Sequence, residues 1–80
     1  MKKTKRLKFQ NKIFNAYINY GSIFSEPYLE ITDDKNDTIY FQSSNTLKLS
    51  NIFESDKILK KILTNLYKDD SELHDLDNLN

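Results

Sequence analysis

The stretch that decides the fold is residues 28–42, YLEITDDKNDTIYFQ. Two runs rich in β-branched and aromatic residues, 28–32 and 38–42, flank five polar residues that favour turns, which predicts a β-hairpin. With Thr32 opposite Thr38, side chains alternate so that one face is apolar and consists of Leu29, Ile31, Ile39 and Phe41. The other face then consists of Tyr28, Glu30, Thr32, Thr38, Tyr40 and Gln42. The hydrophobic pattern and the loop length agree on this register.

The segment before the hairpin fits both a helix and a strand. Apolar residues recur at helical spacing between residues 7 and 20, and Gly21 follows where a helix C-cap is expected. Asn is a poor helix former, however, and Phe14, Ala16 and Ile18 alternate as in a strand. We predict a helix over 7–20, while a strand there would make the domain mostly β. The connector 22–27 follows, and we expect its apolar pair, Ile23 and Phe24, to tuck beneath it.

After the hairpin, Leu47 and Leu49 alternate and predict a short third strand over 46–49. An apolar stripe with helical spacing then comprises Ile52, Leu59, Ile62, Leu63 and Leu66. Asn51 and Ser55 are the candidate N-caps of this helix. The sequence therefore predicts an α+β fold: an N-terminal helix, a three-stranded antiparallel β-meander, and a C-terminal amphipathic helix packed on the apolar face of the hairpin.

Length and composition predict one small domain over residues 1–80. We divide it into a basic, flexible lead-in (1–6), a folded core (7–68) and an acidic tail (69–80). The chain has no Cys, so neither a disulfide nor a thiolate zinc site can staple it. No apolar stretch approaches the ~20 residues that span a bilayer, and the basic N-terminus lacks the apolar region of a secretory signal. These patterns predict a cytoplasmic protein that does not interact with a membrane.

The charges are segregated although the formal net charge is zero. Residues 1–25 contain six basic side chains and no acid, and residues 26–56 contain seven acids and two lysines. Residues 57–68 contain four lysines, and residues 69–80 contain five acids. Such blocks create local fields that the net charge conceals, and those fields bear on partners rather than on the fold.

Groups that carry out chemistry are scarce, which predicts a protein that is not an enzyme and has no cofactor. The single His, His74, lies in the acidic tail, where a solvated surface His is the usual case. The chain has one Gly and no Cys, so a glycine-rich phosphate loop and a thiolate nucleophile are excluded. The acids of the hairpin loop lack the spacing and the closing Glu of a calcium loop, so we predict no metal site.

The leading functional hypothesis is a protein-binding protein that docks onto a larger partner. Its predicted site combines the polar face of the hairpin with the acidic loop: Tyr28, Glu30, Tyr40, Asp33, Asp34 and Asp37. Aromatic residues on an otherwise polar face can anchor an interface. By association, small Cys-free proteins of this kind include inhibitors that phages or mobile elements direct against host or defence proteins.

Two alternatives stay open. The first is a small nucleic-acid-binding regulator that uses the basic N-terminal segment, namely Lys2, Lys3, Lys5, Arg6, Lys8 and Lys12, with Phe9 or Phe14 stacking on a base. Against it, Lys outnumbers Arg eleven to one, and acidic segments elsewhere repel a phosphate backbone. The second is a subunit of a larger assembly or a homodimer, with Leu73, Leu76 and Leu79 as a docking ridge.

Overall fold

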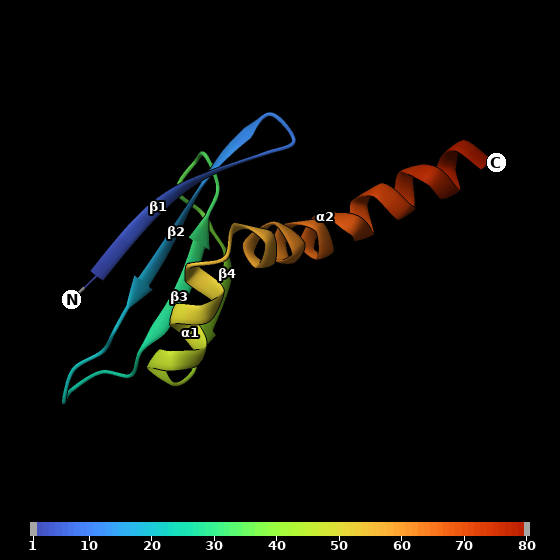
Figure 1. Ribbon diagram of the computed structural model, residues 1–80. Coiled ribbons are helices and arrows are strands. Elements are labelled where there is room, and N and C mark those ends of the chain that lie inside the picture. Colours follow the sequence, from blue (N-terminus) through green and yellow to red (C-terminus); the bar gives the residue numbers. More distant parts are fainter. Residues whose placement is uncertain (1, 80) are drawn as a thin grey trace.

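The computed structural model describes residues 2–79, with side chains up to residue 67. Within this part, four strands form one antiparallel sheet in the order β1-β2-β3-β4: β1 (Lys2–Phe9), β2 (Lys12–Asn19), β3 (Tyr28–Thr32) and β4 (Thr38–Ser43). The helices α1 (Thr46–Phe53) and α2 (Asp56–Leu79) follow, as Figure 1 shows. The α+β class is confirmed, whereas the N-terminal helix and the three-stranded meander are wrong.

A β-hairpin, β1–β2, occupies the segment predicted to be an N-terminal helix. Its turn residues, Gln10 and Asn11, have φ of 51° and 64°, and a two-residue type I′ turn requires positive φ at both positions. The strand alternation in β2 prevails because Phe14, Ala16 and Ile18 are all buried. Residues 2–6, predicted to be a flexible lead-in, belong to β1 and pair with β2.

The β3–β4 hairpin is confirmed, but its register changes after the first pair. Thr32 pairs with Thr38 as predicted, and an irregularity then shifts the partners of Ile31 and Glu30 to Tyr40 and Phe41. A bulge places two residues of one strand opposite one residue of the other, so side chains beyond it change face.

This shift corrects three predicted positions. Phe41 leaves the core side and is 59% exposed, whereas Tyr40 moves to the core side and packs against it. Gln42 moves to the core side too, since it pairs with the buried Leu29. Thr32 keeps its predicted partner but is buried, although it was predicted on the polar face. The two faces of the hairpin therefore differ from the predicted sets mainly on β4.

Helix α1 occupies the position of the predicted third strand. The Asn45 side chain caps it, because Oδ1 accepts a hydrogen bond of 2.8 Å from the Lys48 backbone N–H. Leu49 and Phe53, four residues apart, are both buried against the sheet side, while Leu47 is 73% exposed. Helical spacing thus prevails over the short alternation of the two leucines.

Helix α2 begins after Ser55, whose Oγ accepts a hydrogen bond of 3.2 Å from the Ile58 backbone N–H. Ser55 is therefore the N-cap, and Asn51 lies inside α1. Leu59 and Leu63 are fully buried in the core, so α2 packs against the sheet. It lies next to β1, whereas α1 lies against β2 and β3, so the predicted packing of this helix on the 28–42 hairpin is only partly right. The side chains of the predicted acidic tail, with His74 and the leucine ridge, lie outside the described residues.

The core lies between one face of the sheet and the two helices. Its buried apolar side chains are Leu7, Phe14, Ala16, Ile18, Leu29, Ile31, Leu49, Phe53, Leu59 and Leu63. They come from β1, β2, β3 and both helices, and in Figure 1 both helices lie on the same side of the sheet. The opposite face of the sheet, which we call the outer face, is not covered by α1 or by the described side chains of α2.

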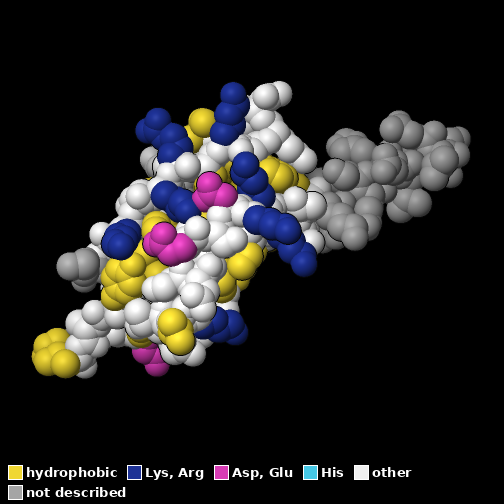
Figure 2. Space-filling view, in the orientation of Figure 1, with side chains coloured by type: hydrophobic (Ala, Val, Ile, Leu, Met, Phe, Trp, Pro, Cys, Tyr) yellow, Lys and Arg dark blue, Asp and Glu magenta, His cyan; other side chains and the backbone are white. Residues whose placement is uncertain are grey.

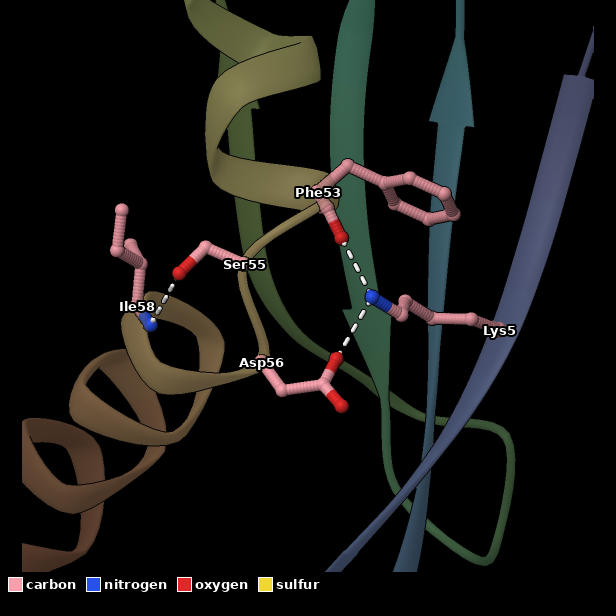
Figure 3. A network of polar contacts seen from close by, with 5 residues as sticks. All are labelled: Lys5, Phe53, Ser55, Asp56 and Ile58. Atoms are coloured by element: carbon pink, nitrogen blue, oxygen red, sulfur yellow. Dashed lines mark hydrogen bonds and ion pairs between the residues drawn. The ribbon is translucent and has the colours of Figure 1, made fainter.

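Lys5 fastens the corner between the helices to β1 (Figure 3). Its Nζ donates a hydrogen bond of 2.8 Å to the Phe53 carbonyl oxygen and lies 2.7 Å from Asp56 Oδ1. A hydrogen bond from Lys5 to the Asp56 carboxylate, together with the positive charge of Lys5, lowers the pKa of that carboxyl below its ordinary 3.8. The contribution of the ion pair to stability is therefore present above the unfolded-state pKa and is lost as the pH falls through the lower folded-state value.

Candidate binding surfaces

The loop between β2 and β3 ends in a hydrogen-bonded two-residue turn. The Ser22 backbone N–H donates to the Ser25 carbonyl oxygen at 2.9 Å, and the Ser25 N–H donates back at 3.4 Å. Ser22 Oγ also accepts a hydrogen bond of 3.1 Å from the Phe24 backbone N–H and lies 3.2 Å from Ser25 Oγ. These contacts fix the backbone on both sides of residues 23 and 24.

The base of this loop is fixed as well. Gly21 has φ of +80°, and a Cβ built on it would lie 2.9 Å from the Pro27 nitrogen and from the Ser25 carbonyl oxygen. Its own N–H donates to Asn19 Oδ1 at 2.8 Å. Only glycine satisfies both the left-handed backbone and the close approach of the returning chain. The predicted helix cap at Gly21 is wrong, since the residue belongs to a hairpin loop.

The turn presents two large apolar side chains to solvent. Ile23 and Phe24 are each 91% exposed, which overturns the prediction that they tuck beneath the connector. Figure 2 shows apolar side chains at the far end of this loop, projecting away from the body of the molecule. Single exposed apolar residues are ordinary, but an adjacent Ile and Phe on a fixed protruding turn are typical of an interaction site.

A third exposed apolar side chain lies at the same end of the sheet. The loop leaves β2 after Asn19, and Leu47 lies four residues beyond the end of β4 in the first turn of α1. Both segments are at the lower end of the molecule in Figure 1. We call Ile23, Phe24 and Leu47 the apolar end.

The acidic loop lies at the opposite end of β3, and its first aspartate organises its backbone. Asp33 Oδ1 accepts hydrogen bonds of 2.9 Å from the backbone N–H groups of Lys35 and Asp37. Asn36 supplies the left-handed residue, with φ of 66°. Among the residues from 2 to 67, no group of three or more His, Cys, Asp or Glu could hold a metal ion.

The residues of the predicted protein-binding site do not come together. Tyr28 and Glu30 lie on the outer face, where the Tyr28 ring stacks on Phe41 with 5.2 Å between centroids and 24° between planes. The Glu30 carboxylate accepts a hydrogen bond from the Thr38 hydroxyl. Tyr40 lies on the helix side, where it lines a shallow pocket with Ile62, Asn65 and Leu66. Asp33, Asp34 and Asp37 lie in the separate acidic loop.

The basic side chains of the N-terminal segment are divided between the two faces of the β1–β2 hairpin. Leu7 is buried, so strand alternation places Lys3 and Lys5 with it on the helix side, and Lys12 shares that side with the buried Phe14. By the same alternation Lys2, Arg6 and Lys8 lie on the outer face. Phe14 is 1% exposed, so it cannot stack on a base as the nucleic-acid hypothesis supposed.

No family model, curated protein or solved structure matches this chain. In the part of the chain that the structure describes, no helix is long and apolar enough to cross a membrane. The apolar end was missed because apolar residues are expected in the core by default. The pattern Ser-Ile-Phe-Ser between Gly21 and Pro27 is the one indication that the sequence offered.

Proposed function

We propose that this chain is a non-enzymatic protein-binding protein that docks onto a larger protein through its apolar end. The observation that carries the proposal is the 91% exposure of both Ile23 and Phe24 on a hydrogen-bonded turn. Folding of this chain by itself buries almost none of the apolar surface of these two side chains. Burial of one such side chain contributes about 1.5–3 kcal/mol, so a partner pocket that accepts both gains a substantial part of a binding free energy.

The fixed turn strengthens this interpretation. Ordering a loop on binding costs free energy, and a loop already held in one conformation avoids most of that cost. The serine hydrogen bonds and the left-handed Gly21 hold this loop before any partner arrives. Large side chains that enter a pocket from a rigid support are the residues that dominate interface energetics.

The inhibitor class suggested by composition stays within this proposal. A chain that inserts a rigid apolar turn into a pocket occupies the surface of its partner, and an inhibitor of a host or defence protein can act in this way. Glu30, Tyr40 and the aspartates of the acidic loop lie away from the apolar end. They contact the partner, as predicted from the sequence, only if its surface extends beyond the apolar end.

A photo-crosslinking experiment tests the proposal. A photoreactive phenylalanine analogue replaces Phe24 in one sample and Ile58 in a matched control, because Ile58 is also exposed (41%) but lies on α2. In a lysate of cells that express the chain, we expect one protein to crosslink through position 24 and not through position 58. That protein is then purified for titration calorimetry.

The calorimetry decides the proposal. We expect the double variant Ile23→Ser/Phe24→Ser to bind the purified partner at least about 30-fold more weakly, since two anchor residues are each worth about 1–2 kcal/mol or more. The control Ile58→Ser should stay within about threefold of the wild type, because an exposed residue outside the contact contributes little. Equal affinity of the double variant and the wild type would refute docking through the apolar end.

A further inference from the structure

The outer face of the sheet carries a row of cations along its edge strand. Lys2, Arg6 and Lys8 alternate with the inward-facing Leu7 and Lys5, and all three are exposed. Because β1 pairs with β2 on one side only, this row lies along an open edge of the sheet. A row of exposed cations along a strand is a site to which a chain of phosphates is attracted.

Aromatic rings lie beside this row, on the next three strands. Tyr17 is paired with Glu30, which is paired in turn with Phe41, so Tyr17 and Phe41 flank one position of β3. Tyr28 stacks on Phe41, and Lys2 Nζ lies 4.7 Å from the centroid of the Tyr17 ring. Phe41 is 59% exposed, whereas Tyr17 and Tyr28 are half-buried. Neighbouring strands are about 5 Å apart, so Tyr17 is within reach of a nucleotide whose phosphate contacts β1. Phe41, on β4, is about 15 Å from β1 and within reach only of a nucleotide that lies further across the sheet.

Glu30 is the one acid among the strand residues of the outer face, against three cations. Its carboxylate accepts a hydrogen bond from the Thr38 hydroxyl and stands between Tyr17 and Phe41 rather than beside the cations of β1. A carboxylate in that position can accept a hydrogen bond from an N–H donor of a base, such as the N3–H of thymine or uracil or the amino group of cytosine. The cations lie on the edge strand β1, and the rings and the acceptor lie on the other three strands. This separation matches the division of a nucleotide into phosphate and base.

We propose that the outer face binds single-stranded nucleic acid. Its phosphates contact Lys2, Arg6 and Lys8 on β1, one base stacks on Tyr17, and the base of a following nucleotide, further across the sheet, stacks on Phe41. The site is distinct from the apolar end. Stacking requires bases that are not already stacked in a duplex, which selects a single strand. Charge complementarity favours this occupant over a protein strand, because the edge that a protein would pair with is lined by lysines, which discourage such pairing.

Fluorescence anisotropy with labelled dT12 and rU12 tests the proposal. We expect saturable binding of the wild-type chain at 50 mM salt, and an affinity about 20-fold lower at 200 mM salt, since three phosphate contacts on a single strand predict a slope of about −2. The variants Tyr17→Ala and Phe41→Ala should each weaken binding by about tenfold. The triple variant Lys2→Ala/Arg6→Ala/Lys8→Ala should show no saturable binding at 50 mM salt.

A triple variant of α2 is the matched control. Lys57→Ala/Lys60→Ala/Lys61→Ala removes the same charge from exposed positions on the helix side and should bind within about threefold of the wild type. Absence of saturable binding at 50 mM salt, or equal loss in the two triple variants, would overturn the proposal. A 12-base-pair duplex that binds as tightly as the single strand would overturn it too, because stacking would then play no part.

A second measurement does not depend on the variants folding. In two-dimensional NMR spectra of the wild-type chain, dT12 should shift the ring resonances of Tyr17, Tyr28 and Phe41, and it should leave those of Phe24 unchanged. Shifts confined to Phe24 or to α2 would contradict the proposed face. The same pattern separates this proposal from docking through the apolar end, which predicts changes at Phe24 with its protein partner.

Discussion

The two loops at opposite ends of β3 solve the same folding problem and present opposite chemistry. Each contains one left-handed residue, Gly21 in one loop and Asn36 in the other. Near its tip, each is held by a polar side chain that accepts backbone hydrogen bonds, Ser22 in one loop and Asp33 in the other. Yet one tip exposes Ile23 and Phe24, whereas the other exposes Asp34, Lys35, Asn36 and Asp37.

This difference shows that the residues that set the conformation of a turn are distinct from the residues exposed at its tip. Conformation comes from the residue with positive φ and from the capping side chain, and those positions are filled by the residue types that turns favour. The tip positions are free of that requirement. A polar tip is what solvent alone selects, so the acidic loop calls for no further explanation, whereas the apolar tip calls for a partner.

The largest expected effect comes from breaking the left-handed position of the apolar loop. Gly21→Ala should lower the free energy of unfolding by about 2–4 kcal/mol, because a left-handed alanine costs about 1–2 kcal/mol and its Cβ would also press on the Pro27 nitrogen and Ser25 oxygen, 2.9 Å away. Urea denaturation followed by circular dichroism measures the change. A loss below about 1 kcal/mol would show that the loop tolerates another backbone path.

The matched change in the acidic loop is Asn36→Gly. Glycine adopts the φ of 66° without strain but gives the unfolded chain more freedom, so these two effects oppose one another. We expect the free energy of unfolding to stay within about 1 kcal/mol of the wild type. A large loss here would mean that the Asn36 side chain does more than adopt the left-handed conformation.

A smaller effect is expected from the two capping side chains. Asp33→Ala removes the acceptor of two backbone N–H groups and should cost about 1–2 kcal/mol, while Ser22→Ala removes the acceptor of one and should cost about half as much. Asp33→Asn keeps an acceptor oxygen and is the control. If Ser22→Ala cost more than Asp33→Ala in the same denaturation assay, the two loops would not be held in the same way.

The sequence predicted those parts of the fold in which local pattern and burial agree. The hairpin over 28–42 is confirmed, and so is a C-terminal helix that buries Leu59 and Leu63 in the core. The β1–β2 hairpin was missed because its turn, Gln10-Asn11, contains no glycine, so nothing interrupts the apparent helical period across it. The register beyond the bulge was missed because a bulge changes no residue type, and only the packing of Tyr40 against the core reveals it.

The candidate sites were harder to predict for a physical reason. An apolar side chain has the same sequence signature whether it is buried by its own chain or by a partner, so Ile23 and Phe24 were assigned to the interior. The cations of β1 were recognised as a group, but their division between two faces follows from strand geometry. The helix prediction concealed that geometry.

The smallest effect on stability is expected from replacing the two apolar side chains at the tip of the β2–β3 loop by polar ones. Ile23→Ser/Phe24→Ser should change the free energy of unfolding by no more than about 0.5 kcal/mol, because substitutions of exposed side chains without partners in the fold stay in that range. Both are 91% exposed, and the turn is held by Ser22, Ser25 and Gly21, which the variant retains.

Leu63→Ser, a fully buried position, is the contrasting control and should cost several kcal/mol, since it adds a cavity and an unpaired hydroxyl. If the tip variant were as unstable as the Leu63 variant, Ile23 and Phe24 would belong to the fold. A stable variant leaves these two residues without a structural role, so a binding role is what remains to account for them.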